Sequence, residues 1–328
     1  MMKLAYFFSG PAALLLAIIA VSGATAGNYP ERGIHLLYGF PPGADIVVRM
    51  LADRLAEILE KPIIVENLTG AAGNIAADHT AKAKPDGYTF GILNSASIVI
   101  NPSLYGKLPY DPVKDLAPVT QVWGYPDVLV VNNNVPVKDV GELVVLARTE
   151  PGKLSFGHSG LGTTQHLAGE VFKSMAGIDI QGVPYRGPPQ ITSDLLAGRI
   201  SMSFLSTGGS FWLMRERKIR PLAVTASTRA SFFPDLPTMR EVGFPGFELN
   251  VWFGLFAPAA TPASIVEKMN RLTVKIMRSE DVRRRLDEIG FAPLANTPAQ
   301  FAAVIAAEIP YWARLIKEHD IKQIDSHP

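Results

Sequence analysis

Strand-like and helix-like segments alternate along most of this chain. The apolar run at residues 34–38 precedes a segment, 45–60, in which apolar side chains recur every three or four positions. The same succession returns within 62–84, 128–149 and 153–226. Because a strand that is followed by a helix rejoins its sheet in parallel, the alternation predicts an α/β fold whose mostly parallel sheets are flanked by helices.

Two extended, proline-rich stretches interrupt this alternation, at residues 110–131 and 233–258. Long non-helical paths between two alternating blocks are suited to crossings between domains. The sequence therefore predicts two lobes. Residues 28–120 together with 250–328 would form lobe I, and residues 121–249 would form lobe II.

The N-terminal segment, residues 1–26, has the features of a secretory signal peptide. Lys3 precedes a long apolar run, and small residues at 24–26 supply a cleavage pattern. A membrane anchor is the alternative, because residues 4–21 are near the shortest length that spans a bilayer. A Gly-Pro pair interrupts that run, which favours cleavage after about Ala26 and a mature protein in the periplasm.

The charge balance and the absence of cysteine exclude several classes of function. Lys and Arg number 31 against 30 Asp and Glu, and no basic stripe marks a nucleic-acid surface. A chain without cysteine has no disulfide framework, thiolate metal site or cysteine nucleophile. The six histidines show neither H-x-H nor H-x-x-x-H spacing, so the sequence predicts no metal site and no cofactor.

Three turns between a strand and a helix are candidates for ligand binding, at residues 40–45, 94–101 and 157–165. In open parallel sheets, ligands bind where strands end, and the first N–H groups of the following helices attract anions. In the first turn, Gly43 permits close backbone approach and Asp45 is expected to cap the helix. Serines and threonines add hydroxyl groups in the other two. Each turn is also compatible with an ordinary connection.

Two motifs around Ser159 resemble enzyme signatures, and each fails at one position. The stretch "GHSGL" has Leu161 where a hydrolase nucleophile elbow needs glycine. The stretch "GLGTTQ" has Gln165 at the third glycine of the dinucleotide fingerprint. A secreted hydrolase that uses Ser159 is thus an alternative that the residues do not favour, and we expect no enzyme.

Each of a few further side chains is compatible with two roles. His158 lies in the third candidate turn, whereas His166 lies one turn into a helix and is expected to be packed. Arg186, at the end of a strand, could bind a carboxylate with two hydrogen bonds or lie in solvent. Three tryptophans could line a cleft or pack a core, namely Trp123, Trp212 and Trp252.

Several longer stretches together resemble the periplasmic solute-binding receptors of tripartite tricarboxylate transporters, the Bug-type receptors. They include "YPERGIHLLYGFPPG", "ADIVVRMLADRLAEILEKPIIVENLTGAAGNIAA", "HLAGEVFKSMAGIDIQGVPYRG" and "FPDLPTMREVGFPGFE". The resemblance covers nearly the whole mature chain. It implies a two-lobed periplasmic binding protein clamshell that grips a ligand, usually by a carboxylate, with backbone N–H groups and hydroxyls. It also implies membrane permease subunits as partners.

The chain departs from that family's pattern at two places. The first turn is two residues shorter than the family's F-x-x-G-G-x-[TA]-D, which bears on how many N–H donors it offers. Leu205 stands where many relatives carry an aspartate, which argues against a ligand with an ammonium group.

The resulting expectation is a monomeric extracytoplasmic protein that captures a small di- or tricarboxylate or aromatic acid and delivers it to a permease. A receptor that signals to a sensor partner remains an alternative. The residues expected to line the cleft are Phe40, Gly43, Ala44, Asp45, Ser95, Ser97, His158, Ser159, Gly160, Thr163, Thr164, Arg186 and Ser206.

Overall fold

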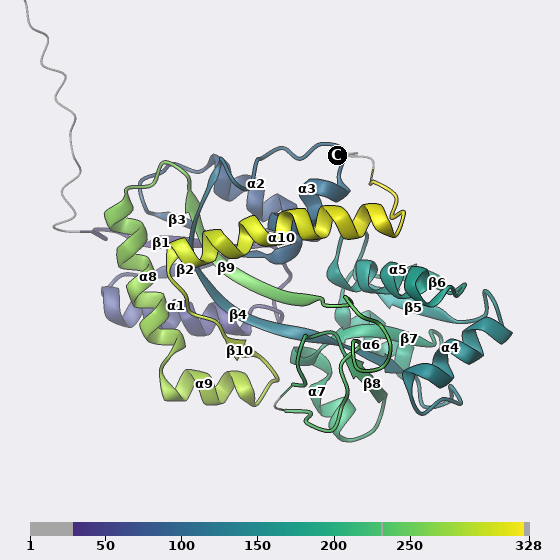
Figure 1. Ribbon diagram of the computed structural model, residues 1–328. Helices are drawn as coiled ribbons and strands as arrows, with labels where there is room; N and C mark the ends of the chain where they lie inside the picture. The colour runs from purple at the N-terminus through teal and green to yellow at the C-terminus, as the bar shows by residue number, and fades with distance from the viewer. Residues whose placement is uncertain (1–28, 231, 325–328) are drawn as a thin grey trace, which may run out of the picture.

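The computed structural model describes residues 29–230 and 232–324, and Figure 1 shows its two lobes side by side. The strands form one continuous mixed sheet in the order β2-β1-β3-β9-β4-β7-β5-β6, with β8 and β10 also paired to β4. The strands are β1 (Ile34–Tyr38), β2 (Ile63–Asn67), β3 (Thr89–Asn94), β4 (Leu116–Val131), β5 (Ser155–His158), β6 (Gln181–Pro184), β7 (Met202–Ser206), β8 (Arg220–Val224), β9 (Asn250–Pro258) and β10 (Ala292–Pro293).

Helices cover both faces of this sheet, as the alternation predicts. The helical elements are α1 (Ile46–Leu59), η1 (Ala71–Gly73), α2 (Asn74–Lys82), η2 (Ala96–Ile100), α3 (Asn101–Leu104), α4 (Val140–Thr149), α5 (Thr164–Ala176), α6 (Pro188–Leu196), α7 (Thr207–Arg215), α8 (Ala263–Met277), α9 (Glu280–Asp287) and α10 (Pro298–Glu318).

Local sequence signals set several of these helix limits. The Thr163 side chain accepts the His166 N–H at the start of α5, and Gly177 ends the helix in the left-handed conformation that glycine adopts without strain. A capping box between Thr297 and Gln300 starts α10. These short-range rules explain why the predicted bounds of α4 and α5 agree with the structure to within a residue or two.

The sheet is parallel within each lobe and antiparallel where the lobes meet. Strands β2, β1 and β3 pair in parallel in the first lobe, and β6, β5 and β7 do so in the second. Strands β9 and β4, which join the lobes, are antiparallel to their neighbours. The two-lobed α/β fold is thus confirmed, with a mixed rather than a purely parallel sheet.

Strand β4 is much longer than the sequence indicates. We predicted a strand only at 128–131 after an extended crossing, but β4 runs unbroken from Leu116 and pairs with β9 as far as Pro126. From Asp127 onward it pairs with β7 and β8 instead. Prolines, which cannot donate to a ladder, usually end a central strand, but register shifts between Pro118 and Trp123 accommodate the irregularity here. The lobe limits at 120/121 and 249/250 stay predictions.

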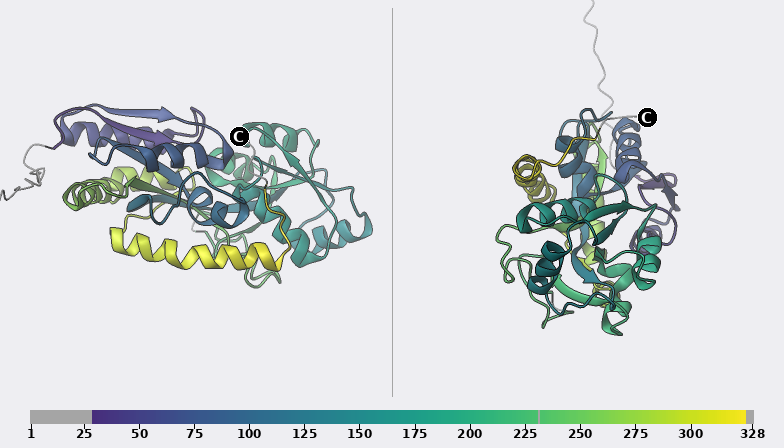
Figure 2. Two further views of the ribbon diagram at one scale, coloured as in Figure 1. Left: turned by 90° about the horizontal axis from the view of Figure 1, so that it is seen from above. Right: turned by 90° about the vertical axis from the view of Figure 1, so that its right-hand side faces the viewer.

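Helix α10 lies along one side of the molecule and contacts both lobes (Figure 2). The Tyr311 hydroxyl donates to the Glu248 carbonyl oxygen at 3.0 Å, and His319 Nδ1 lies 2.8 Å from the Ser174 hydroxyl of α5. A single buried apolar cluster runs through this side and includes Phe301 of α10 and Phe172 of α5. On the other side each lobe has a further core of its own, beneath α1 and α8 in the first and beneath α6 and α7 in the second.

Within residues 29–230 and 232–324, no helix combines the length and apolarity that crossing a bilayer demands. The predicted signal segment, residues 1–26, lies outside the described residues.

Candidate ligand-binding cleft

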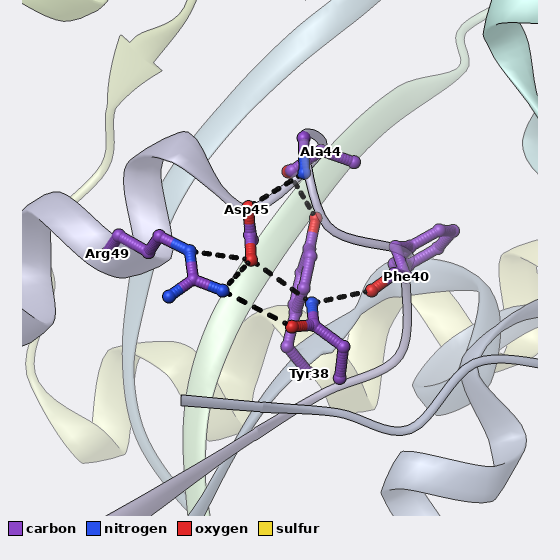
Figure 3. A network of polar contacts seen from close by, with 7 residues as sticks. Tyr38, Phe40, Ala44, Asp45 and Arg49 are labelled. Carbon is purple, nitrogen blue, oxygen red and sulfur yellow. Dashed lines mark hydrogen bonds and ion pairs between the residues drawn. The ribbon is translucent and has the colours of Figure 1, made fainter. Parts of the chain in front are cut away.

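The turn at residues 40–45 is held by the buried carboxylate of Asp45 (Figure 3). This carboxylate accepts hydrogen bonds from the Gly43 N–H at 3.0 Å, from Arg49 Nε at 2.9 Å and from Asn67 Nδ2 at 3.2 Å. Asn67 Nδ2 also donates to the Phe40 carbonyl oxygen at 2.8 Å. The predicted cap is wrong: Asp45 occupies the cap position of α1, but its side chain bonds its own turn and Arg49 instead of a helix N–H.

The charge on Asp45 is stabilised by these contacts. Burial acts to raise the pKa of the carboxyl, but the hydrogen bonds from Arg49, Gly43 and Asn67, with the Arg49 charge, outweigh it and lower the pKa. Asp45 therefore remains ionised at neutral pH. Its charge is neutralised locally, so it organises the turn instead of facing a ligand as a bare anion.

The backbone donors of this turn are partly used within it. The Gly43 N–H bonds Asp45, and the Ala44 N–H donates to the Pro41 carbonyl oxygen at 3.2 Å. The Tyr38 hydroxyl donates to the Ala44 carbonyl oxygen at 2.9 Å. Within the described part of the chain, the first N–H groups of α1, at Ile46 and Val47, have no acceptor. The N-terminus of α1 is thus the part of this turn that is free to bind an anion.

The turn between β5 and α5 has a similar organisation. The Gln165 side-chain oxygen accepts from the Ser159 N–H at 3.1 Å and from the Ser159 hydroxyl at 2.6 Å. The Thr163 hydroxyl donates to the Gly160 carbonyl oxygen at 2.8 Å. An amide oxygen cannot remove the Ser159 proton as a general base would, so the contacts give no support to a serine nucleophile.

His158 and His166 pack against each other beside this turn, with ring centroids 4.9 Å apart and ring planes inclined at 52°, and both are buried. Burial lowers the pKa of His158 despite smaller opposing contributions from the Gly160 backbone and Glu170. Burial, with the neighbouring His158 and Lys173, lowers the pKa of His166 to about 4. Both rings are therefore neutral at pH 7, and His166 is packed as expected.

A chain of contacts through β4 links the two turns. The Thr164 side chain, in the first turn of α5, lies close to the Asp127 carboxyl, and Ser206 at the end of β7 lies close to the Tyr125 hydroxyl. Ser206 is also the register partner of Asp127. The Tyr125 ring lies in the group of aromatic side chains around Phe253, which also contains Tyr38, Phe40 and Trp123. Contacts thus connect the α1 turn of the first lobe to the α5 turn of the second.

Asp127 was missed by the sequence analysis. It is 1% exposed, and burial raises the pKa of its carboxyl to about 7 while the neighbouring Thr164 side chain acts to lower it. The available signal was an acid immediately before the apolar run at 128–131. Its burial depends on Thr164 and Ser206, which lie far along the chain.

The segment between β2 and α2 was also missed. Gly70, Ala71, Ala72 and Gly73 all have positive φ, a strained conformation for the two alanines. Gly39 packs against Gly73, and Asn94 Nδ2 donates to the Ala72 carbonyl oxygen at 3.2 Å. The turns after β1, β2 and β3 therefore gather at one end of the first lobe. The glycines of "TGAAGN" were the available signal.

The candidate turn at residues 94–101 is not a loop. Residues 96–100 form the π-helical turn η2, which continues into α3. Ser95 and Ser97 are buried, and the Ser97 hydroxyl donates to the Asn94 carbonyl oxygen at 3.0 Å. The helix begins directly at the strand end because all side chains from 96 to 100 are buried.

The remaining predictions have separate outcomes. Arg186 is exposed beyond the edge strand β6, and its N–H donates to Gln190 Oε1 at 3.2 Å. Trp123 and Trp252 pack in the cores, whereas Trp212 is 59% exposed on α7.

A hollow of about 1090 Å³ lies between Phe232 and the α9–β10 segment, and none of the predicted binding residues lines it. The turns remain the candidate site, because the first N–H groups of α1 have no acceptor in the described chain, whereas the hollow is lined largely by charged side chains of α9 and by the β10 segment.

Two α/β lobes joined by long strands, with helix N-termini at their junction, define a two-lobed solute-binding protein. The family comparison is specific. The chain belongs to the family described as "Tripartite tricarboxylate transporter family receptor", whose model matches residues 47–321. The predicted family is thereby confirmed, and so is the expectation of a binding protein instead of an enzyme.

Known relatives cover nearly the whole chain. Protein BugT of Bordetella pertussis is 34% identical over 94% of this chain and 98% of its own. The structure described as "R. palustris Rpa4515 with adipate" has 35% identity and a TM-score of 0.85, and covers 90% of this chain and 100% of its own. MatC from Rhodopseudomonas palustris with bound malate has 30% identity and a TM-score of 0.81, with coverage of 88% and 100%.

Proposed function

We propose that the protein captures a small organic carboxylate between its lobes, outside the cytoplasm, and delivers it to membrane permease subunits. The observation that carries the proposal is the pair of helix N-termini, of α1 and α5, whose first N–H groups have no acceptor in the described chain. Such groups and the partial positive charge of a helix start favour anions. Relatives of similar fold bind adipate and malate, which supports a carboxylate as the anion.

The predicted side chains divide into two roles under this proposal. Asp45, with Arg49 and Asn67, fixes the turn so that the α1 N–H groups are preorganised. Thr164 and Ser206 lie at the junction and supply hydroxyls for the far end of the ligand. In the shorter first turn, the N–H groups at the start of α1 bind the ligand, because the Gly43 and Ala44 N–H groups already have acceptors.

Lobe closure is the expected way in which binding is communicated to the permease. Strands β4 and β9 and helix α10 join the lobes. Rotation of one lobe relative to the other about these elements would move the α1 turn away from the α5 turn. A ligand that contacts both lobes favours the closed arrangement by its differential affinity for it. We further propose cleavage after about Ala26, a periplasmic location and a monomeric mature protein.

Thermal shift with matched pairs of ligands tests the proposal. Malate, adipate, citrate and benzoate should be compared with the corresponding neutral amides at equal concentration. We expect at least one acid to raise the melting temperature while its amide does not, because the helix starts bind the carboxylate charge. Stabilisation by amides or cationic solutes in place of every acid would contradict the proposal.

The contribution of the α5 turn is tested by Thr164→Val with Thr192→Val as the control. Thr164 lies at the junction, whereas the Thr192 hydroxyl donates to Pro188 within α6. We expect Thr164→Val to lower the affinity for the best acid about tenfold and Thr192→Val to leave it unchanged. Equal affinities for the two variants would exclude a ligand at this turn.

A further inference from the structure

Asp127 lies where β4 passes from one lobe to the other. Its strand neighbours change at this residue, from β9 at Pro126 to β7 at Asp127 itself. Residues two apart on a strand face the same side, so Asp127 shares a side with Tyr125. Tyr125 contacts the aromatic group of the first lobe, and Asp127 contacts Thr164 at the start of α5 in the second. The carboxyl is therefore placed between the two proposed anion-binding turns.

The polar environment of this carboxyl is incomplete. Asp127 is 1% exposed, and its Oδ2 atom has no hydrogen-bond partner in the described chain. The Thr164 side chain is its polar neighbour, and among the residues the structure describes no lysine or arginine forms an ion pair with it. A buried carboxylate with a free oxygen is costly, and protonation removes that cost.

We infer that Asp127 is a specificity-determining binding residue that takes up a proton when an anionic ligand enters the cleft, and then donates a hydrogen bond to the ligand carboxylate. This inference rests on the proposed function. In this step one proton passes from solvent to Asp127 Oδ2, and no covalent bond of the ligand changes. After binding, Asp127 is neutral, so the ligand carries the only charge of this pair. A protonated Asp127 is neutral, so it does not repel an acid and supplies a donor where the free oxygen now lies.

The direction of the proton exchange follows from electrostatics. A second negative charge nearby disfavours ionised Asp127, so binding raises the pKa of a carboxyl that burial already holds at about 7. Binding is therefore tighter at lower pH, and the affinity falls by up to tenfold per pH unit above about 7. A ligand with an ammonium group would act in the opposite direction and release a proton.

Other titratable groups near Asp127 do not account for such an effect. On β4 itself, the pKa of Tyr125 is raised well above its usual range by burial and by Asp127. On α5, burial lowers the pKa of His166 to about 4, and on β5 burial lowers the pKa of His158. Both histidines are neutral above pH 7. Ser206 of β7 does not titrate in this range.

Isothermal titration with adipate tests the inference, because both adipate carboxyls, with pKa values near the usual value of about 4, stay ionised above pH 7. Titrations at pH 7.5 in phosphate and in Tris give the number of protons exchanged, from the different ionisation heats of the two buffers. If adipate does not bind, malate and then citrate are used. We expect an uptake of between about one half and one proton per ligand in the wild type.

The isosteric variant Asp127→Asn provides the matched control. It keeps the shape and a hydrogen-bond donor but cannot titrate, so we expect no proton uptake and an affinity that does not change from pH 6.5 to 8.5. In Thr164→Val the polar neighbour that lowers the Asp127 pKa is lost, and uptake should become maximal at a higher pH. This second variant, with the wild-type measurement, decides the question if Asp127→Asn does not fold.

Each outcome has a definite meaning. An acid that binds with no proton uptake, or uptake that persists in Asp127→Asn, overturns the role of Asp127 but leaves the proposed function intact. Proton release on binding also overturns it. If none of the three acids binds, the proposed function and this inference fail together.

Discussion

Asp45 and Arg49 lie one helical turn apart and form an ion pair, with 2.7 Å between Arg49 Nη2 and Asp45 Oδ2. The Asp45 side chain is buried, whereas Arg49 is about half exposed. The pair fixes the turn that leads into α1 because the same carboxylate also accepts the Gly43 N–H. A charged pair that looks like ordinary helix-surface pairing in the sequence is here the support of the candidate site.

We therefore expect Asp45→Ala to lower the free energy of unfolding by about 1–3 kcal/mol, because the Gly43 N–H and the Asn67 amide lose their acceptor. Ligand affinity should fall as well, since the turn is less ordered. Arg54→Ala is the control: its ion pairs with Glu57 and Asp281 are exposed and should contribute less than about 1 kcal/mol. Equal losses in urea unfolding would contradict the assigned role of Asp45.

The stability of the protein should depend on Asp127 in a specific pH range. Burial raises the folded-state pKa to about 7, whereas an unfolded aspartate has a pKa of about 3.9. Between these values the folded state holds more protons, so this group's contribution to the free energy of unfolding falls as pH rises, by at most about 1.4 kcal/mol per unit.

Urea unfolding of the wild type and Asp127→Asn from pH 4.5 to 8.5 measures this dependence. Relative to the wild type, the variant should gain stability steadily up to about pH 7 and no further above it. A constant difference in unfolding free energy across that range would show that Asp127 does not titrate there.

Two glycines of the α5 turn allow a test of the contact between the lobes. Gly160 and Gly162 both have positive φ, so alanine costs about 1 kcal/mol of backbone strain at either position. A Cβ at Gly160 meets open space, whereas one at Gly162 lies 3.0 Å from Asn101 Oδ1 and 3.2 Å from the Tyr105 ring. Gly162→Ala should therefore lose about 1 kcal/mol more than Gly160→Ala in thermal or urea unfolding. Indistinguishable variants would mean that this interlobe contact has no energetic weight.

A second contact joins the lobes through α7. The Thr207 hydroxyl is buried and donates to the Gly290 carbonyl oxygen at 2.6 Å. Replacing it by the isosteric valine leaves that carbonyl without its donor and should lower the free energy of unfolding by about 1–2 kcal/mol. The loss should be larger in the presence of a bound acid, which favours the closed lobes. A Thr207→Val variant with wild-type stability, both with and without a bound acid, would show that this contact does not stabilise the protein.

Local signals in the sequence predicted the elements well where short-range physics determines them. The caps at Thr163 and Gly177 set the limits of α5, and apolar periodicity located α1. The length of β4 could not be predicted, because its prolines are accommodated by register shifts that only the partner strand β9 reveals. The helical start at residue 96 likewise depends on burial that tertiary packing imposes.

The sequence indicated the turns of the candidate site but not the hydrogen bonds formed within them. Glycines and hydroxyls marked the turns at 40–45 and 157–165, but the use of the Gly43 N–H by Asp45 is a matter of side-chain direction. Asp127 was marked only by its place before the apolar run at 128–131, because its neighbours Thr164 and Ser206 are brought to it by the fold.

Native mass spectrometry of the exported protein, purified without denaturation, tests the central claim most directly. The account predicts one small organic acid bound per protein, lost on unfolding and replaced when adipate or malate is added in excess. A neutral or cationic solute in the same stoichiometry, undisturbed by any added acid, would contradict the claim that the two helix starts form a carboxylate site.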